Sequence, residues 1–387
     1  MGRMTNPFQS LFLLDPEIIF LNHGSFGACP RPVFEAYRDW QLKLERQPVL
    51  FLGRELIHYD QQARQALGEY LHAEAADLVY LPNATHGVNI VARSLDLKPG
   101  DEILTTDHEY GACDNTWEFL CQKRGAVYIH QALDLPLGST KEIIELLWQG
   151  VTPRTRLIFI SQIASPTALI LPVRAICQRA RQEGILTLVD GAHAPGQITV
   201  DLQAIGADFY TGNCHKWMLS PKGAAFLYTR PEAQPLIEPL VVSWGYSADE
   251  NTTSGSRYID LLDWTGTKDP AAALSVPCAI QFMQEHNWSE VSAGCHQLAV
   301  ETRRQLNALT GLEALCGEEG FYQMFSVRLP GQTDLARLKA RLYDEFRIEV
   351  PVILWKGQKL IRISIQAYNS RSNADALIAA LQTLLKL

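Results

Sequence analysis

The chain has 387 residues, of which 47% are hydrophobic and 20% charged, and its net charge is −8 at pH 7. This length and composition favour a globular protein with a large core, divided into two domains. The negative charge argues against nucleic acid or an anionic membrane as a partner, and no apolar run approaches the roughly 20 residues of a membrane span.

The cysteines and the N-terminus indicate a cytoplasmic protein. The N-terminal apolar stretch is short, is broken by Asp15 and Pro16, and lacks a small-residue cleavage site. Eight single cysteines with no CxxC pattern are typical of reduced thiols rather than of a disulfide framework or a zinc site. They are Cys29, Cys113, Cys121, Cys177, Cys214, Cys278, Cys295 and Cys316.

The middle of the chain alternates apolar strands with amphipathic helices. Strands are expected within 101–110, 154–165, 184–196 and 223–230, and a helix within 172–184, where apolar residues recur every three to four positions before a glycine. This alternation predicts an α/β fold with a mostly parallel sheet covered by helices on both faces.

The C-terminal part has a different pattern. The polar, glycine-bearing stretch 243–270 predicts the crossing into a second domain. Strands at 324–330 and 359–365, with a helix near 333–346 and a closing helix, predict a smaller α+β domain. We therefore expect an N-terminal arm that packs on the small domain, a large cofactor-binding domain and a small domain. Their expected limits are 1–15, 16–262 and 263–387.

Polar side chains follow the apolar strands at the points where the strands end. Ligands of open α/β sheets bind at the carboxyl ends of the strands, so these separate segments are expected to form one site. The side chains are Thr106, Asp107 and Tyr110, then Ser161 to Thr167, then Asp190 and His193.

Lys216 lies between His215 and Trp217, in a stretch with unusually few charges. One interpretation is a lysine that buries its methylene stem and keeps its ammonium in water. The other is a desolvated amine beside a cationic group, since both effects lower the pKa of the amine and free its lone pair to attack a carbonyl.

Asp190 follows the apolar run Ile185–Val189. Such an aspartate is commonly a turn or helix cap. Taken alone, the residue favours the cap, which is the commoner use, over a carboxylate that holds the N–H of a protonated pyridine ring and so makes the ring an electron sink.

Three further features each have two interpretations. The helix that begins near Thr85 is an ordinary capped helix or a phosphate-binding terminus. Tyr110 is a core aromatic or lies over a flat ring. Arg362, inside an apolar strand, requires a structural acid or a substrate carboxylate as its partner. Taken with Asp190 and a lysine about 26 positions later, these features favour pyridoxal 5′-phosphate (PLP) as the cofactor, with the lysine forming the Schiff base.

At these residues the sequence resembles the class V aminotransferase family of fold type I PLP enzymes, over nearly the whole chain. VDGAHAPGQ (189–197) and TGNCHKWMLSPKGAAFLY (211–228) carry the resemblance. FLNHGSFGACP (20–30), DHEYGA (107–112) and ISQIASPTALILPV (160–173) are most similar to its isopenicillin N epimerase-like branch.

The resemblance implies a role for each matching residue. Lys216 is the aldimine lysine, Asp190 the partner of the pyridine nitrogen, His193 a contact of the phenolic oxygen and Tyr110 the ring-stacking residue. The phosphate is surrounded by Ala84, Thr85, His86, Asn213 and His215. Thr267 reaches the phosphate of the neighbouring subunit, which implies a homodimer with shared active sites. Arg362 grips the substrate carboxylate, and Asn22 and His23 line the substrate pocket.

The chain departs from related sequences in two respects. Cysteine desulfurases of this family carry a nucleophilic cysteine shortly before the arginine-bearing strand, whereas residues 317–387 contain no cysteine. Ala168 stands where relatives often have glycine. The residue that contacts the cofactor oxygen is therefore either Ser165 or Thr167, and the sequence does not choose between them.

Other classes of protein lack their motifs here. No GxGxxG, GxxxxGK[ST] or HExxH occurs, and HGSFG (23–27) is not a GxSxG elbow. A metal hydrolase would have to use Asp190, His193, Cys214 and His215, whose spacings match no common zinc site. An inactive binding protein on the same scaffold is the further alternative.

The expected reaction is at the α-carbon of an amino acid. Epimerisation, transamination and Cβ–S cleavage all begin with removal of the α-proton, and the motifs do not choose among them.

Overall fold

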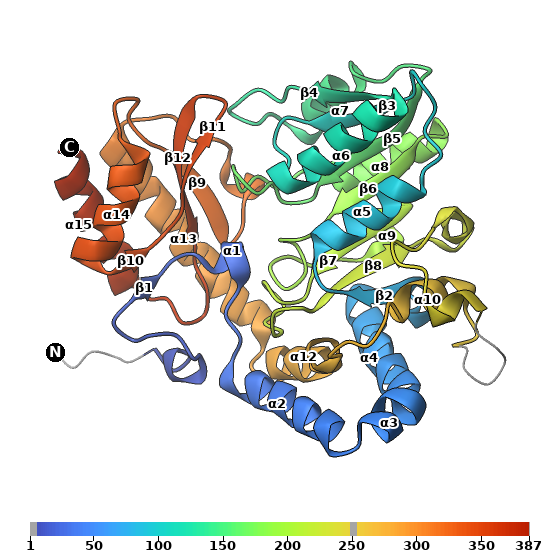
Figure 1. The fold of residues 1–387 in the computed structure, drawn as a ribbon. Coiled ribbons are helices and arrows are strands. Elements are labelled where there is room, and N and C mark those ends of the chain that lie inside the picture. Colours follow the sequence, from blue (N-terminus) through green and yellow to red (C-terminus); the bar gives the residue numbers. More distant parts are fainter. Residues whose placement is uncertain (1–5, 248–253, 387) are drawn as a thin grey trace.

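The computed structural model describes residues 6–247 and 254–386, which form two lobes around two separate sheets (Figure 1). A seven-stranded sheet builds the large lobe, and a three-stranded antiparallel sheet builds the small lobe. Within the described residues, no helix has the length and apolar character needed to cross a membrane.

The large sheet has the strand order β2-β8-β7-β6-β5-β3-β4. Only β8 runs antiparallel to its neighbours, and the other paired strands are parallel in direction. The strands are β2 (Leu78–Leu81), β3 (Glu102–Thr106), β4 (Val127–Gln131), β5 (Thr155–Ser161), β6 (Leu186–Asp190), β7 (Phe209–Asn213) and β8 (Ala225–Thr229).

Central strands are apolar at consecutive positions because both faces of the sheet are covered. In β5, Ile158 and Ile160 pack into the core cluster on one face, while Leu157 and Phe159 pack into the cluster on the other. The first cluster includes residues of α2 (Arg31–Arg46), α4 (Leu56–Leu71), α7 (Thr140–Trp148), α8 (Val173–Gln182), α9 (Leu202–Ile205), α11 (Ala271–Leu274) and α12 (Val276–Glu285). The second includes residues of α5 (Ala84–Ser94), α6 (Gly111–Arg124) and α10 (Arg257–Asp263).

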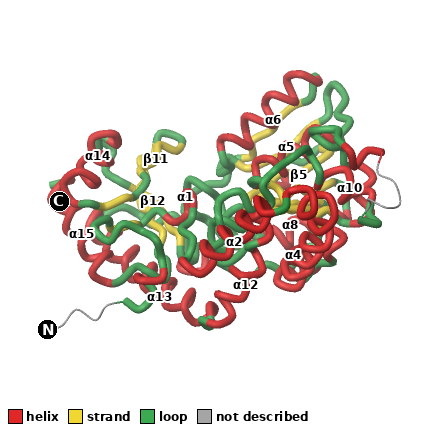
Figure 2. The backbone as a smooth tube through the Cα atoms, turned by 60° about the horizontal axis from the view of Figure 1, so that its bottom comes forward, coloured by secondary structure: helices red, strands yellow, loops and turns green. Residues whose placement is uncertain are grey.

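The small sheet has the order β11-β12-β9, and α14 and α15 lie on its side away from the large lobe (Figures 1 and 2). Its elements are β9 (Met324–Arg328), β11 (Val352–Trp355), β12 (Gln358–Ser364), α13 (Trp288–Thr310), α14 (Leu335–Phe346) and α15 (Arg371–Leu385).

The N-terminal segment joins this lobe. Asn6 donates to Ala367 O at 2.7 Å, and β1 (Ile19–Phe20) pairs with β10 (Ile348–Glu349).

The short helix α1 (His23–Phe26) lies between the two lobes (Figure 1). A Cβ on Gly24 would lie 2.6 Å from Met324 Sδ of the small lobe, and a Cβ on Gly27 would lie 2.1 Å from His215 O of the large lobe. These contacts leave no room for a side chain at either position, so α1 links the two lobes at close range. A short α3 (Pro48–Leu50) follows α2.

The structure confirms the predicted α/β class, the mostly parallel sheet and the α+β character of the C-terminal part. The sequence did not indicate β2, β4 and β7 of the large sheet, nor β1, β10 and β11 near the C-terminal part, and β8 runs antiparallel rather than parallel. The predicted domain limits stay a prediction, and residues 1–5 of the predicted arm lie outside the described residues.

Candidate active site

Lys216 stands in the turn that joins β7 to β8. Burial desolvates its amine, and this effect, reinforced by the charge of Arg362, lowers the pKa of Lys216 to about 8. Nζ lies 3.2 Å from His193 Nε2, and Lys216 forms no ion pair within the described residues. The environment therefore matches a desolvated amine rather than a lysine whose ammonium reaches water.

His193 favours the neutral form of this amine. Trp217 Nε1 donates to His193 Nδ1 at 3.4 Å, which leaves the proton of the neutral ring on Nε2. Nε2–H then points at Lys216 Nζ, whose lone pair can accept it. Burial and the charge of Lys216 hold the pKa of His193 well below its usual range, so the ring stays neutral.

The backbone around the lysine is held by close packing. Lys216 O bonds with His23 Nε2 at 3.0 Å. Gly196 adopts φ +86, and a Cβ there would lie 2.3 Å from the backbone of Trp217. Burial lowers the pKa of His23 to about 3, and its other nitrogen meets Tyr368 Oη at 3.0 Å. His23 thus contacts the lysine turn from α1, and its lining of the substrate pocket stays a prediction.

Asp190 ends β6 and is buried. One carboxylate oxygen accepts from Ala192 N at 2.9 Å, which is the turn-capping contact that its position suggested. The other accepts from Cys113 Sγ at 3.7 Å. Burial raises the pKa of Asp190, and these donors and Lys216 oppose the rise. Capping therefore occupies only one of its two oxygens.

Residues predicted to hold a phosphate meet where β7 ends and α5 begins. Asn213 Oδ1 accepts from Ala84 N at 2.9 Å, and Asn83 caps the helix by accepting from His86 N at 2.9 Å. The first turn of α5, with Thr85, thus starts beside the lysine turn. A helix N-terminus attracts anions because its amides and dipole present positive charge.

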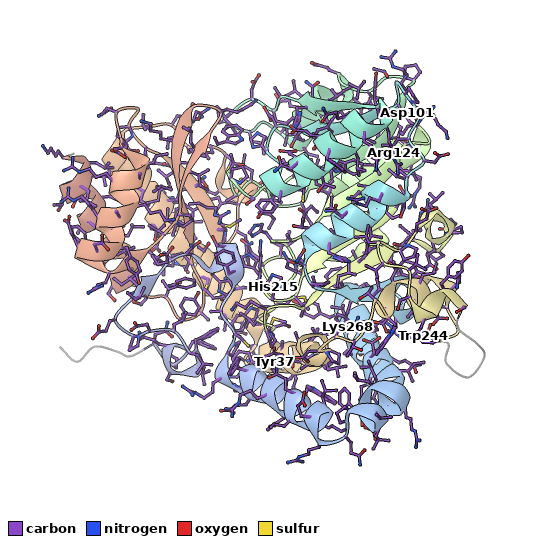
Figure 3. The ribbon with its side chains drawn as sticks, viewed as in Figure 1. Tyr37, Asp101, Arg124, His215, Trp244 and Lys268 are labelled. Atoms are coloured by element: carbon purple, nitrogen blue, oxygen red, sulfur yellow. The ribbon has the colours of Figure 1, made fainter. Side chains whose placement is uncertain are left out.

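His215 lies near α1 at the centre of the molecule (Figure 3). Its Nδ1 bonds with Ala224 O at 2.9 Å, so Nδ1 is the protonated nitrogen of the neutral ring. Burial, with the charge of Lys216, lowers the pKa of His215 to about 4. Its Nε2 remains as an acceptor.

Arg362, on β12, is the cation of the small lobe that reaches this site. It is 5% exposed, and burial lowers its pKa to about 10. Nη1 donates to Ser165 O at 2.6 Å and to Ser165 Oγ at 3.1 Å, and Nη2 donates to Ser25 Oγ at 3.1 Å. Among the described residues, Nε has no partner and the guanidinium meets no carboxylate. The sequence allowed a structural acid as the partner of Arg362. Among residues 6–247 and 254–386, no such acid pairs with it.

Ser25 links the guanidinium of Arg362 to other residues of the N-terminal segment. Its Oγ donates to Asn22 Oδ1 at 2.5 Å, and Asn22 Nδ2 donates to Glu349 Oε1 at 2.9 Å. Sequence reasoning identified Asn22 but missed Ser25, although both stand in the NHGSFG motif that it quoted.

The remaining predicted contacts lie around the loop that follows β5. Ser165 is engaged with Arg362, and Thr167 Oγ1 meets His108 Nδ1 at 2.9 Å. Ala168, where relatives often have glycine, adopts φ +61, a left-handed conformation that suits glycine better. Tyr110 begins α6 and is 47% exposed. Its role as the ring-stacking residue stays a prediction.

These residues fit PLP. A lysine of lowered pKa suits an aldehyde, a buried carboxyl suits a ring nitrogen, and a helix terminus suits a phosphate. A buried arginine with no carboxylate partner among the described residues suits a substrate carboxylate. Within residues 6–247 and 254–386, no three His, Cys, Asp or Glu side chains are grouped to hold a metal ion. Fold and site together define a PLP-dependent enzyme of fold type I.

Comparison with known proteins identifies the family. The family described as Aminotransferase class-V matches residues 29–377. The chain is 38% identical to isopenicillin N epimerase of Amycolatopsis lactamdurans, over 96% of each chain. It is 30% identical to the probable chloroplastic L-cysteine desulfhydrase of Arabidopsis thaliana, over 96% of this chain and 84% of that protein. The crystal structure of the cysteine desulfurase CsdA from Escherichia coli superposes with a TM-score of 0.82 at 21% identity, covering 98% of each chain.

The chain therefore belongs to the class V aminotransferase family, which confirms the resemblance found in its motifs. The fold, the PLP cofactor and the enzyme class predicted from the sequence are confirmed with it.

The lowered pKa of Lys216 makes a prediction for cofactor loading. Only the neutral amine attacks an aldehyde, so the rate at which the apoprotein develops a visible absorption band on addition of PLP should rise about tenfold per pH unit up to about pH 8 and then level off. Stopped-flow absorbance between pH 6 and 9 measures this rate. Lys216→Ala should give no such band, and a wild-type rate that does not change with pH would contradict the assignment.

Proposed function

We propose that the protein acts on the α-carbon of an amino acid, as an epimerase or an aminotransferase. The observation that carries the proposal is the pair formed by the desolvated amine of Lys216, whose pKa is lowered, and a buried Arg362 that has no carboxylate partner in the described part of the chain. An α-amino acid carries both groups that this pair requires, an α-carboxylate for the arginine and an α-proton for the amine.

Each residue has a distinct task in this proposal. PLP, when bound, withdraws electrons from the substrate's α-carbon. Arg362 binds the α-carboxylate, with Ser25 and Ser165 fixing the plane of its guanidinium. Lys216 then takes and returns the α-proton at its Nζ, and His193 stays neutral beside it.

The cofactor is held by the residues that the family resemblance assigned. Asp190 faces the pyridine nitrogen, His193 the phenolic oxygen and Tyr110 the ring. The phosphate lies with Ala84, Thr85, His86, Asn213 and His215, and the other oxygen contact comes from Ser165 or Thr167. Asn22 and His23 belong to the substrate side. The contacts of Asn213 with Ala84 and of His193 with Lys216 support this arrangement.

Cβ–S cleavage of a cysteine derivative is the second candidate, and one observation favours a direct form of it. Residues 317–387 contain no cysteine, and the eight cysteines are all buried or half-buried. A reaction that stores sulfur on a protein thiol near the arginine-bearing strand has no nucleophile there. Sulfide would instead leave the substrate directly.

We also propose that the enzyme works as a cytoplasmic homodimer. Eight free cysteines without a disulfide support the location. Val242, Trp244 and Tyr246 are large apolar side chains with exposures of 68%, 80% and 62%, and they support the presence of a covering subunit. Figure 3 shows Trp244 at the edge of the large lobe, next to α10.

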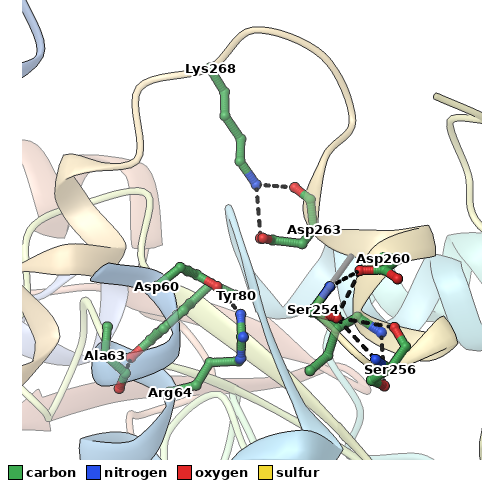
Figure 4. Close-up of polar contacts among 10 residues, drawn as sticks. Asp60, Ala63, Arg64, Tyr80, Ser254, Ser256, Asp260, Asp263 and Lys268 are labelled. Atoms are coloured by element: carbon green, nitrogen blue, oxygen red, sulfur yellow. Dashed lines mark hydrogen bonds and ion pairs between the residues drawn. The ribbon is translucent and has the colours of Figure 1, made fainter. Parts of the chain in front are cut away.

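The loop that carries Thr267 is fixed within its own subunit. Lys268 bonds to Asp263 through both the backbone oxygen and the carboxylate, as Figure 4 shows. Thr267 itself is exposed. The same view shows the buried pair Arg64 and Asp60 of α4, and the buried Tyr80 Oη donates to Ala63 O of α4 at 2.8 Å. A fixed loop with an exposed threonine supports a contact with a second subunit.

The reaction class can be tested on a panel of L- and D-amino acids that includes cysteine. All candidate reactions begin by removing the α-proton, so NMR in D2O should show α-deuteration by the PLP-loaded enzyme. Chiral chromatography, oxo-acid detection and sulfide detection then separate epimerase, aminotransferase and lyase.

Arg362→Ala should raise KM about 10- to 100-fold, because a charge-assisted contact is lost, whereas Arg337→Ala on exposed α14 should not. Absence of α-exchange from every amino acid, with PLP bound, would refute the proposal.

Shared active sites can be tested by complementation. Lys216→Ala and Thr267→Val subunits, coexpressed with different tags, should form mixed dimers in which one of the two sites keeps both Lys216 and the Thr267 of the partner subunit. At low PLP concentration these mixed dimers should show the absorption band that neither parent shows. A monomeric protein in light scattering, or mixed dimers without the band, would rule out the sharing of sites.

A further inference from the structure

Glu109 is a buried acid that the assigned roles do not use. It is 5% exposed and accepts three short hydrogen bonds. Thr106 Oγ1 lies 2.6 Å from Oε1, while Ser161 N and Ser161 Oγ lie 2.8 and 2.5 Å from Oε2. Both carboxyl oxygens are thus engaged, one with the end of β3 and one with the end of β5.

These partners place Glu109 between two parts of the site. It immediately precedes Tyr110, which begins α6. Ser161 is the residue directly opposite Asp190 in the pairing of β5 with β6. A single side chain therefore ties the segment that carries Tyr110 to the strand position beside Asp190.

The titratable groups that face Glu109 within the described residues are two carboxyl groups, a thiol and a phenol. Asp190 on β6 and Asp114 on α6 face it, and Cys113 on α6 and Tyr128 on β4 are the other titratable neighbours. Within the described residues it forms no ion pair. Burial raises the pKa of Glu109 to about 8, its hydrogen bonds oppose this rise, and the negative charge of Asp190 adds to it.

We propose that Glu109 is a positioning residue of the active site that acts as a neutral carboxylic acid, holding the Tyr110 segment against the strand end beside Asp190. A neutral acid both donates and accepts hydrogen bonds, so it can join two hydroxyl groups without adding a second charge next to Asp190. The inference rests on the proposed function, because it is the PLP site that these two residues would serve.

Glutamine should replace Glu109 in this role, and alanine should not. The glutamine oxygen can accept from Ser161 and its amide can donate to Thr106 Oγ1. Titration of the apoprotein with PLP should give a Kd for Glu109→Gln within about threefold of wild type. Glu109→Ala should raise Kd about tenfold, because buried donors lose their acceptor and the segment shifts. Equal affinity of the alanine variant and the wild type would overturn the positioning role.

The protonation state is tested without the cofactor. A carboxyl of folded pKa about 8 and unfolded pKa about 4.3 stabilises the fold when protonated, and that stability is lost as pH rises between those values. The Tm of apo Glu109→Gln minus that of the apo wild type should therefore increase from pH 5 to about pH 8 and be constant above. Glu118→Gln, an exposed position of α6, should give a difference that does not vary with pH.

A pH-independent difference for Glu109→Gln would overturn the neutral acid. This result is separate from failure of the proposed function, which would appear as a wild-type protein that binds no PLP.

Discussion

The desolvated amine of Lys216 is the constraint on which the rest of the site depends. Removing an ammonium from water is costly, so burial lowers the pKa of the amine to about 8 and makes its neutral form easier to reach. Burial and the charge of Arg362 act in this direction, whereas Asp190 and Cys113 oppose it. His193 presents an N–H to the amine because Trp217 occupies its other nitrogen, and Arg362 adds a positive charge from the opposite lobe. The amine of lowered pKa, the neutral imidazole and a guanidinium with no carboxylate partner among residues 6–247 and 254–386 suit an aldehyde and a carboxylate.

The second constraint is that this site has to be assembled from two lobes. Lys216 belongs to the seven-stranded sheet and Arg362 to the three-stranded sheet. Helix α1 joins them, since Gly27 packs on the backbone of the lysine turn and Ser25 bonds to the guanidinium. A change in the relative position of the lobes would therefore alter the carboxylate site and the amine together. The N-terminal segment, which pairs with the small lobe through β1, thus contacts both Arg362 and the lysine turn.

The sequence predicts the class of the fold well, for physical reasons, and the structure brings Lys216, His193 and Arg362 close to one another as the motifs suggested. Strands buried on both faces give long apolar runs, and β3, β5 and β6 show them. The three missed strands of the large sheet lack such runs. β4 is an edge strand with exposed positions, β7 carries a glycine and an asparagine, and β2 has only four residues before a proline. The direction of β8 cannot be predicted from the spacing of its apolar residues, since side chains alternate between the two faces of the sheet in parallel and antiparallel strands alike.

Side-chain partnerships are the part that sequence reasoning missed. Ser25 meets Arg362 from 337 positions away, and Cys113 meets Asp190 from 77 positions away. No local spacing encodes such pairs. Glu109 was visible within DHEYGA, but a carboxylate next to polar residues in a loop gives no sign of burial. Only the three-dimensional contacts show that it is enclosed between strand ends.

The central claim is that the amine of Lys216 is the group that joins the cofactor. The most direct measurement is peptide mass spectrometry of the PLP-loaded protein after borohydride reduction. The account predicts one reduced pyridoxyl group per subunit, carried by the peptide that contains Lys216. The label on another lysine such as Lys222, or no label at all on a protein that retains its fold, would contradict it.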